Sequence, residues 1–109
     1  MWARNHQATE ADRDADIDQS DLPDTIKDLL KQIRDLKEQL LKKEQELREA
    51  MSDDALGDRQ REAKVRQIQS EMSVLSSAIK NAYSMLAELT RELHLSDGQM
   101  ASIAQLTQR

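Results

Sequence analysis

Four aspartates alternate near the N-terminus and come closest to a metal-binding pattern: Asp12, Asp14, Asp16 and Asp18. Alternating acids open helical calcium-binding loops, in which a glycine holds the sixth position and a glutamate the twelfth. Counted from Asp12, those positions hold Ile17 and Pro23. Because neither required residue is present, we interpret the run as a solvated acidic segment and predict no calcium site.

Other side chains that could do chemistry lack the setting that a reaction needs. The chain has no cysteine, which excludes disulfides, thiolate metal sites and a cysteine nucleophile. The two histidines, His6 and His94, lie far apart in the sequence and are assigned no metal. No glycine-rich turn exposes a serine as a nucleophile. We therefore predict a protein that is not an enzyme and that carries no cofactor and no metal.

The composition favours helices that share a narrow seam over a deep globular core. In 109 residues, 34% are charged and 2% are aromatic, with two glycines and one proline. Sandwiches and barrels need aromatic side chains and turn residues that this chain lacks. We therefore expect an all-α fold.

The charge is concentrated at one end of the chain. Residues 1–21 hold six acids and two bases, Arg4 and Arg13, and so carry most of the net charge of −5. The remaining residues together are nearly neutral. A nearly neutral body offers no stripe that would neutralise phosphates, so nucleic acid is not an expected partner. No apolar run resembles a signal peptide or a membrane span, so we predict a cytoplasmic protein without a membrane partner. Export by a route that reads an uncleaved N-terminus is compatible with the same sequence.

Two segments repeat apolar residues with the heptad period of a coiled coil. The first has its a and d positions at Ile26, Leu29, Ile33, Leu36, Leu40, Lys43, Leu47 and Ala50. The second has them at Val65, Ile68, Met72, Leu75, Ile79, Ala82, Leu86, Leu89 and Leu93. Between the segments, the polar stretch near residues 52–58 contains Gly57 and predicts a turn. Two heptad helices joined by a short turn should form a long antiparallel coiled-coil hairpin.

The expected organisation has three parts. Residues 1–20 are predicted to be a disordered or loosely docked acidic tail, in which Trp2 is either a docking anchor or simply unstructured. Residues 21–95 form the hairpin, with its first helix beginning near Leu22 and with Asp58, or as the alternative Ser52, capping the second. Residues 96–109 form a short C-terminal helix, because Ser96 and Gln99 match the spacing of a capping box.

A partner surface is predicted from the register of the hairpin. Pairing positions whose numbers sum to about 109 leaves Leu86, Leu89 and Leu93 beyond the first helix, so they must meet the third helix, a second copy or another protein. The predicted partner-binding residues are Tyr83, Leu86, Leu89, Leu93, Met100, Ile103 and Leu106.

Apolar residues outside the a and d positions widen the seam into a face typical of a bundle. They are Leu30, Leu41, Val74, Ala78, Tyr83 and Met85. A lone hairpin buries little surface for each residue that it orders, so we expect association into a helical bundle, with itself or with a helical partner. Lys43 in a d position either fixes the register or marks fraying near the turn.

The segment from Gln32 to Leu40, QIRDLKEQL, is followed after an acidic turn by the segment from Gln67 to Leu75, QIQSEMSVL. In these two segments the chain resembles the FlxA-like family of small bacterial helical hairpins. It covers roughly residues 26 to 80. It implies a helical hairpin without catalytic residues and, from the founding member, an association with the flagellar regulon.

Two functions are compatible with these features. The first is an interaction or assembly protein, such as an adaptor or a coiled coil associated with secretion or flagella, that acts through its helical faces. The second is a small acidic inhibitor or chaperone, whose acidic tail would mimic or guard a partner surface. Deleting residues 1–20 separates them, because only the second needs the tail.

Overall fold

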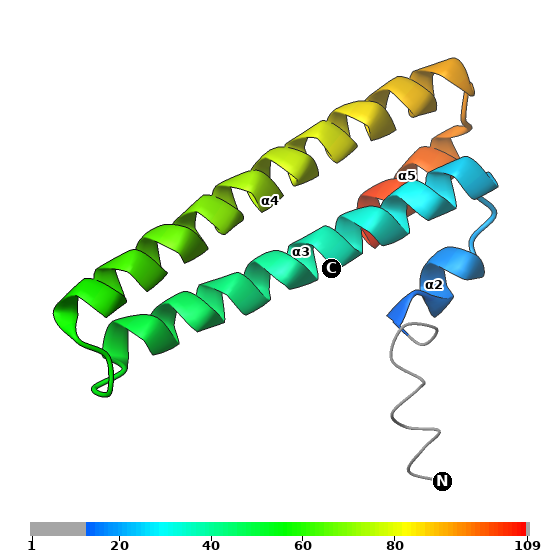
Figure 1. The fold of residues 1–109 in the computed structure, drawn as a ribbon. Coiled ribbons are helices and arrows are strands. Elements are labelled where there is room, and N and C mark those ends of the chain that lie inside the picture. Colours follow the sequence, from blue (N-terminus) through cyan, green and yellow to red (C-terminus); the bar gives the residue numbers. More distant parts are fainter. Residues whose placement is uncertain (1–12, 109) are drawn as a thin grey trace, which may run out of the picture.

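The computed structural model describes residues 13–108, and these form a helical hairpin with a shorter helix before it and another after it (Figure 1). The elements are α2 (Ala15–Asp18), α3 (Asp24–Ser52), α4 (Asp58–Glu92) and α5 (Asp97–Leu106). Helices α3 and α4 lie antiparallel along their length, while α2 and α5 lie beside the open end, opposite the turn. The predicted all-α hairpin with a short C-terminal helix is confirmed.

The turn between the long helices is held by side chains of its own. Asp53 accepts a hydrogen bond from the backbone N–H of Ala55 at 2.9 Å, and Arg61 donates to the carbonyl oxygens of Asp53 and Leu56 at 2.6 and 3.2 Å. The residue that caps α4 is Gly57, whose N–H is bonded to the side chain of Gln60 at 3.2 Å. The prediction of Asp58 as the cap was wrong by one position, because Asp58 is already the first helical residue.

The connection from α4 to α5 reverses the chain within four residues. His94 adopts a left-handed conformation with φ of 50°, which ends α4. Ser96 then caps α5 by accepting from the N–H of Gln99 at 3.1 Å, while the Gln99 side chain accepts from the N–H of Ser96 at 3.0 Å. The capping box expected from the sequence is therefore present, and it directs α5 back along the hairpin.

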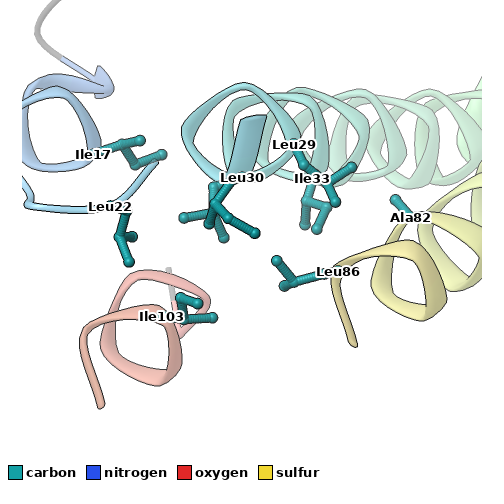
Figure 2. Packing of buried hydrophobic residues seen from close by; sticks show 9 residues of the cluster. Ile17, Leu22, Leu29, Leu30, Ile33, Ala82, Leu86 and Ile103 are labelled. Carbon is teal, nitrogen blue, oxygen red and sulfur yellow. The ribbon is translucent and has the colours of Figure 1, made fainter. Parts of the chain in front are cut away.

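The hydrophobic core lies at the open end, where all four described helices meet (Figure 2). We call this cluster the open-end core; its buried members are Ile17, Leu22, Ile26, Leu29, Leu30, Ile33, Ala82, Leu86 and Ile103. Toward the turn, by contrast, only Ala50 and Ile68 of the described apolar residues are buried. The hairpin thus has one well-packed end and one sparsely packed end.

The end of the predicted tail is docked onto α3 rather than disordered. Ile17 in α2 is 0% exposed and belongs to the open-end core. Its aspartate neighbours face basic residues of α3: Asp16 bonds to Arg34, and Asp18 forms an ion pair with Lys31 at 2.6 Å. One apolar side chain and paired charges therefore order the end of a segment that was expected to be disordered or loosely docked. Residues 1–12 of that tail lie outside the described residues.

Candidate functional site

The predicted partner surface is divided by the structure into covered and uncovered residues. Leu86 and Ile103 are buried in the open-end core, and Tyr83, Leu89 and Leu106 pack against it. Leu93 and Met100 remain exposed. The sequence predicted that the leucines after position 85 meet the third helix, a second copy or another protein. The structure shows the first of these contacts, because α5 brings Ile103 and Leu106 to the open-end core.

The register behind that prediction was wrong at the open end. Leu86 lies with Leu29 and Ile33 in the core, so it has a counterpart in α3 and does not overhang it (Figure 2). A pairing rule that counts from the middle of the turn assumes that neither helix is staggered. The loop of residues 53–57 is long enough to allow an offset, and packing in the core then decides the pairing.

The half of the hairpin nearer the turn, residues 38–78, has too little apolar cover, and we call it the arm. Its inward-facing residues Leu40, Leu47, Met72 and Leu75 are only half-buried. Buried apolar residues usually touch several neighbours, and in a two-helix pair half of those neighbours are missing. The arm is therefore the part of the described chain that most needs a further helix.

The exposed apolar side chains of the arm lie on two different sides. Leu41 of α3 is 65% exposed and Val74 of α4 is 66% exposed. Val74 is nine residues from Tyr83, which places it on the opposite side of α4 at 3.6 residues per turn. Tyr83 itself faces Lys37, on the side where α5 lies. The arm thus has one apolar face continuous with the α5 side and a second, smaller apolar patch at Val74.

A groove of about 470 Å³ follows the α5 side of α3 in the arm. We call it the arm groove, and the residues that line it are Arg13, Arg34, Lys37, Glu38, Leu40, Leu41 and Glu44. Further toward the turn, Leu47 and Met51 line two more hollows with residues of α4. Since Leu40, Glu44, Leu47 and Met51 follow at spacings of three and four, they form one stripe along the helix. The α4 side of these two hollows is largely polar, so the apolar surface is concentrated in the arm groove itself, next to the end of α5.

The buried side chain of Arg34 lines the end of the arm groove that is nearest to α5. The side chain of Arg34 is only 6% exposed, and it donates to both carboxylate oxygens of Asp16 at 2.6 and 2.8 Å. It also donates to the carbonyl oxygens of Arg13 at 2.9 Å and Leu106 at 3.1 Å. Its Nε has no hydrogen-bond partner among the described residues. Arg34 thus ties α2 and the C-terminal end of α5 to α3, and we call this set of contacts the Arg34 junction.

Neighbouring charges reinforce the Arg34 junction. The hydrogen bond with Asp16 raises the pKa of Arg34 further above its ordinary value, so the guanidinium stays charged despite its burial. Lys37 donates to the carbonyl oxygen of Thr107 at 2.9 Å and lies 5.3 Å from the centre of the Tyr83 ring. Cations at the C-terminal end of a helix interact favourably with its dipole. Two basic residues of α3 therefore hold the end of α5 at the start of the arm groove.

Lys43, which interrupts the first heptad, reaches across the seam to α4. Its ammonium lies 3.2 Å from a carboxylate oxygen of Glu71 and 3.5 Å from one of Glu46. The hydrogen bond with Glu71 raises the pKa of Lys43 above its ordinary value. This cross-helix ion pair supports the interpretation that Lys43 fixes the register. It also leaves a polar break in the middle of the arm.

Sequence reasoning found part of this surface and missed part of it. Leu41 and Val74 were recognised as apolar residues outside the seam, but the side on which a partner would lie was not. Arg34 was missed altogether, because its heptad position faces outward and is normally exposed. Ile17 stands between Asp16 and Asp18, and Arg34 lies in the first heptad segment that follows. An isolated apolar residue flanked by acids, together with a basic residue in the next segment, is the signal that could have indicated this contact.

Searches for a metal-ligand cluster and a membrane-spanning helix among the described residues, and for matches among known proteins, gave no match. Within residues 13–108, no three His, Asp or Glu side chains gather as metal ligands would. No helix in that range is long and apolar enough to cross a membrane. Among known proteins, the chain matches no family model, no curated protein and no solved structure. The resemblance to the FlxA-like family therefore stays a prediction.

Proposed function

We propose that this chain is a non-enzymatic interaction or assembly protein that binds other helices through the arm of its hairpin. The observation that carries the proposal is the arm groove, whose exposed Leu41 stands beside half-buried residues of the seam. Scattered exposed leucines are normal, but an apolar groove beside an underpacked helix pair is typical of a helix-binding surface. The bound helix would lie where α5 would lie if it continued toward the turn.

The partner is a second copy of the chain, a helical segment of another protein, or both. A cytoplasmic coiled coil associated with secretion or flagella remains our proposal for the setting, supported by the resemblance of the two heptad segments alone. The residues of the predicted surface that stay exposed are Leu93, which caps the end of α4, and Met100, in the first turn of α5. Neither residue lines the arm groove. We therefore assign them a secondary role in binding.

The arm supports this function better than the acidic tail supports the alternative of an inhibitor or chaperone. Asp14 lies 3.3 Å from Arg13, and Asp16 is bonded twice to Arg34. An acidic segment that mimics a partner's ligand needs its carboxylates turned outward, whereas these are engaged within the chain. Only acids of the tail outside the described residues are left to carry such an activity.

The proposal is tested by capture from the source cell with two matched variants. The wild-type chain, Leu41→Glu and Val74→Glu are each immobilised, and retained proteins are identified by mass spectrometry. A specific protein retained by the wild type and Val74→Glu but lost with Leu41→Glu is the expected result. The two substituted leucine and valine side chains have nearly equal exposure, so the comparison isolates the side of the arm. A chain that retains nothing and stays monomeric at all concentrations would overturn the proposal.

A further inference from the structure

The segment that contains α2 is joined to α3 by charges that match in order. Three ion pairs, each at 2.6 Å, cross between the two segments: Arg13 with Glu38, Arg34 with Asp16, and Lys31 with Asp18. The segments therefore run antiparallel, and each charge faces one of the opposite sign. A shift by one turn in either direction would bring two like charges together, such as Arg13 with Arg34. The charges thus specify both the position and the direction of α2.

Apolar burial alone does not explain why α2 docks. Ile17 is the buried residue of this four-residue helix. Ordering a segment of several residues costs conformational entropy that the burial of one isoleucine does not offset. Charged side chains of α3 also bind the backbone of the segment, since Lys27 and Arg34 each donate to one of its carbonyl oxygens at 2.9 Å. The charges therefore decide whether α2 stays in place.

Most of these charges lie within reach of salt. The side chains of Asp18 and Glu38 are 52% and 44% exposed, whereas that of Arg34 is buried. Pairs between exposed charges contribute little free energy and are screened by salt, while buried pairs are screened less. A short element held by such pairs belongs to the least stable part of a fold.

We propose that α2 is a latch held closed by its charges, which opens when salt screens them while the hairpin stays folded. Opening uncovers a basic stripe on α3, formed by Lys27, Lys31 and Arg34 at spacings of four and three. It also withdraws Arg13 from the lining of the arm groove. The latch therefore hides basic side chains on an acidic chain. This inference goes beyond the proposed function and does not depend on the arm groove binding a helix.

Hydrogen exchange of the full chain at increasing salt tests whether α2 opens separately. The amides of Asp18 and Gln19 report on the latch, because they donate to Asp14 and Ala15 at 3.0 and 2.9 Å. Raising the salt from about 0.1 to 1 M shortens the screening length from about 10 to 3 Å. Relative to their intrinsic rates, these amides should then exchange roughly three to ten times faster. The amide of Ile68 in α4 should change by less than about twofold.

Charge reversal distinguishes the paired charges from a general effect of salt. Asp18→Lys places two ammonium groups together and should speed exchange in α2 more than salt does. Glu88→Lys makes the same change in net charge at an exposed position of α4 and should leave α2 protected. Combining Asp18→Lys with Lys31→Asp restores a pair of opposite charges, so this double variant should recover most of the protection. Circular dichroism checks that each variant keeps its helicity.

Three results would overturn the latch. Protection of α2 that is the same at low and high salt would mean that the burial of Ile17 holds the segment without its charges. A double variant that exchanges as fast as Asp18→Lys would mean that the pairing of opposite charges is not what docks α2. Equal loss of protection in α2 and in α4 would show that α2 opens only when the whole hairpin unfolds.

Discussion

Replacing Arg34 by methionine tests whether the Arg34 junction stabilises the fold. Methionine keeps an apolar stem of similar length but removes the charged group that bonds Asp16, Arg13 and Leu106. Breaking a buried ion pair by removing one partner costs about 3–5 kcal/mol. Asp16 keeps 34% of its side chain exposed, so water replaces part of what it loses. We therefore expect the free energy of unfolding to fall by about 2–3 kcal/mol.

Urea unfolding followed by circular dichroism measures this change, and hydrogen exchange locates it. Amides in α2 and in the last turn of α5 should exchange faster in Arg34→Met, while those of α4 near Ile68 should keep their rates. Lys80→Met is the matched control, because Lys80 is exposed on α4 outside the arm and should change stability by less than about 0.5 kcal/mol. If the free energy of unfolding of Arg34→Met lies within about 0.5 kcal/mol of the wild-type value, solvent replaces the contacts of the junction, and our account of the docked ends fails.

Three further predictions concern other described residues. The hydrogen bond from Arg13 lowers the pKa of Glu38. This bond therefore stabilises the fold above the ordinary glutamate pKa, and the stabilisation is lost as pH falls through the lowered pKa. In urea titrations between about pH 6 and 3, the wild type should lose more stability than Glu38→Gln. His94→Gly should raise the free energy of unfolding by about 0.5–1 kcal/mol, because glycine adopts the left-handed φ without strain, and His94→Ala should give no such gain. Ile17→Ala should cost about 2–4 kcal/mol in the same assay, against less than about 0.5 for the exposed Met85→Ala, and equal effects would mean that α2 does not dock.

The sequence was informative wherever a local pattern repeats. Two runs of leucine and isoleucine at heptad spacing predict the hairpin, and a single pair, Ser96 and Gln99, predicts the start of the last helix. These features depend on residues three or four apart on one helix. Their consequences can be worked out without knowing the rest of the fold.

The docked ends of the chain could not be predicted in this way. Ile17 stands alone among aspartates and shows no period, so its burial depends on contacts with α3 far along the chain. Arg34 is buried only because α2 and α5 cover it from two sides. The offset of the hairpin also depends on core packing, which is why Leu86 was expected to overhang the first helix and instead lies within the core.

The Arg34 junction also has a consequence for the order of folding. Its bonds join α3 to Arg13, 21 positions earlier, and to Leu106, 72 positions later. Closing so long a loop costs chain entropy before any contact compensates for it, unless α4 has already brought α5 back alongside α3. We expect the hairpin to form from the turn outward and the junction to assemble last. A contact of this kind forms late in folding and is among the first to open, so the two chain ends should be released together while the hairpin between them is still intact.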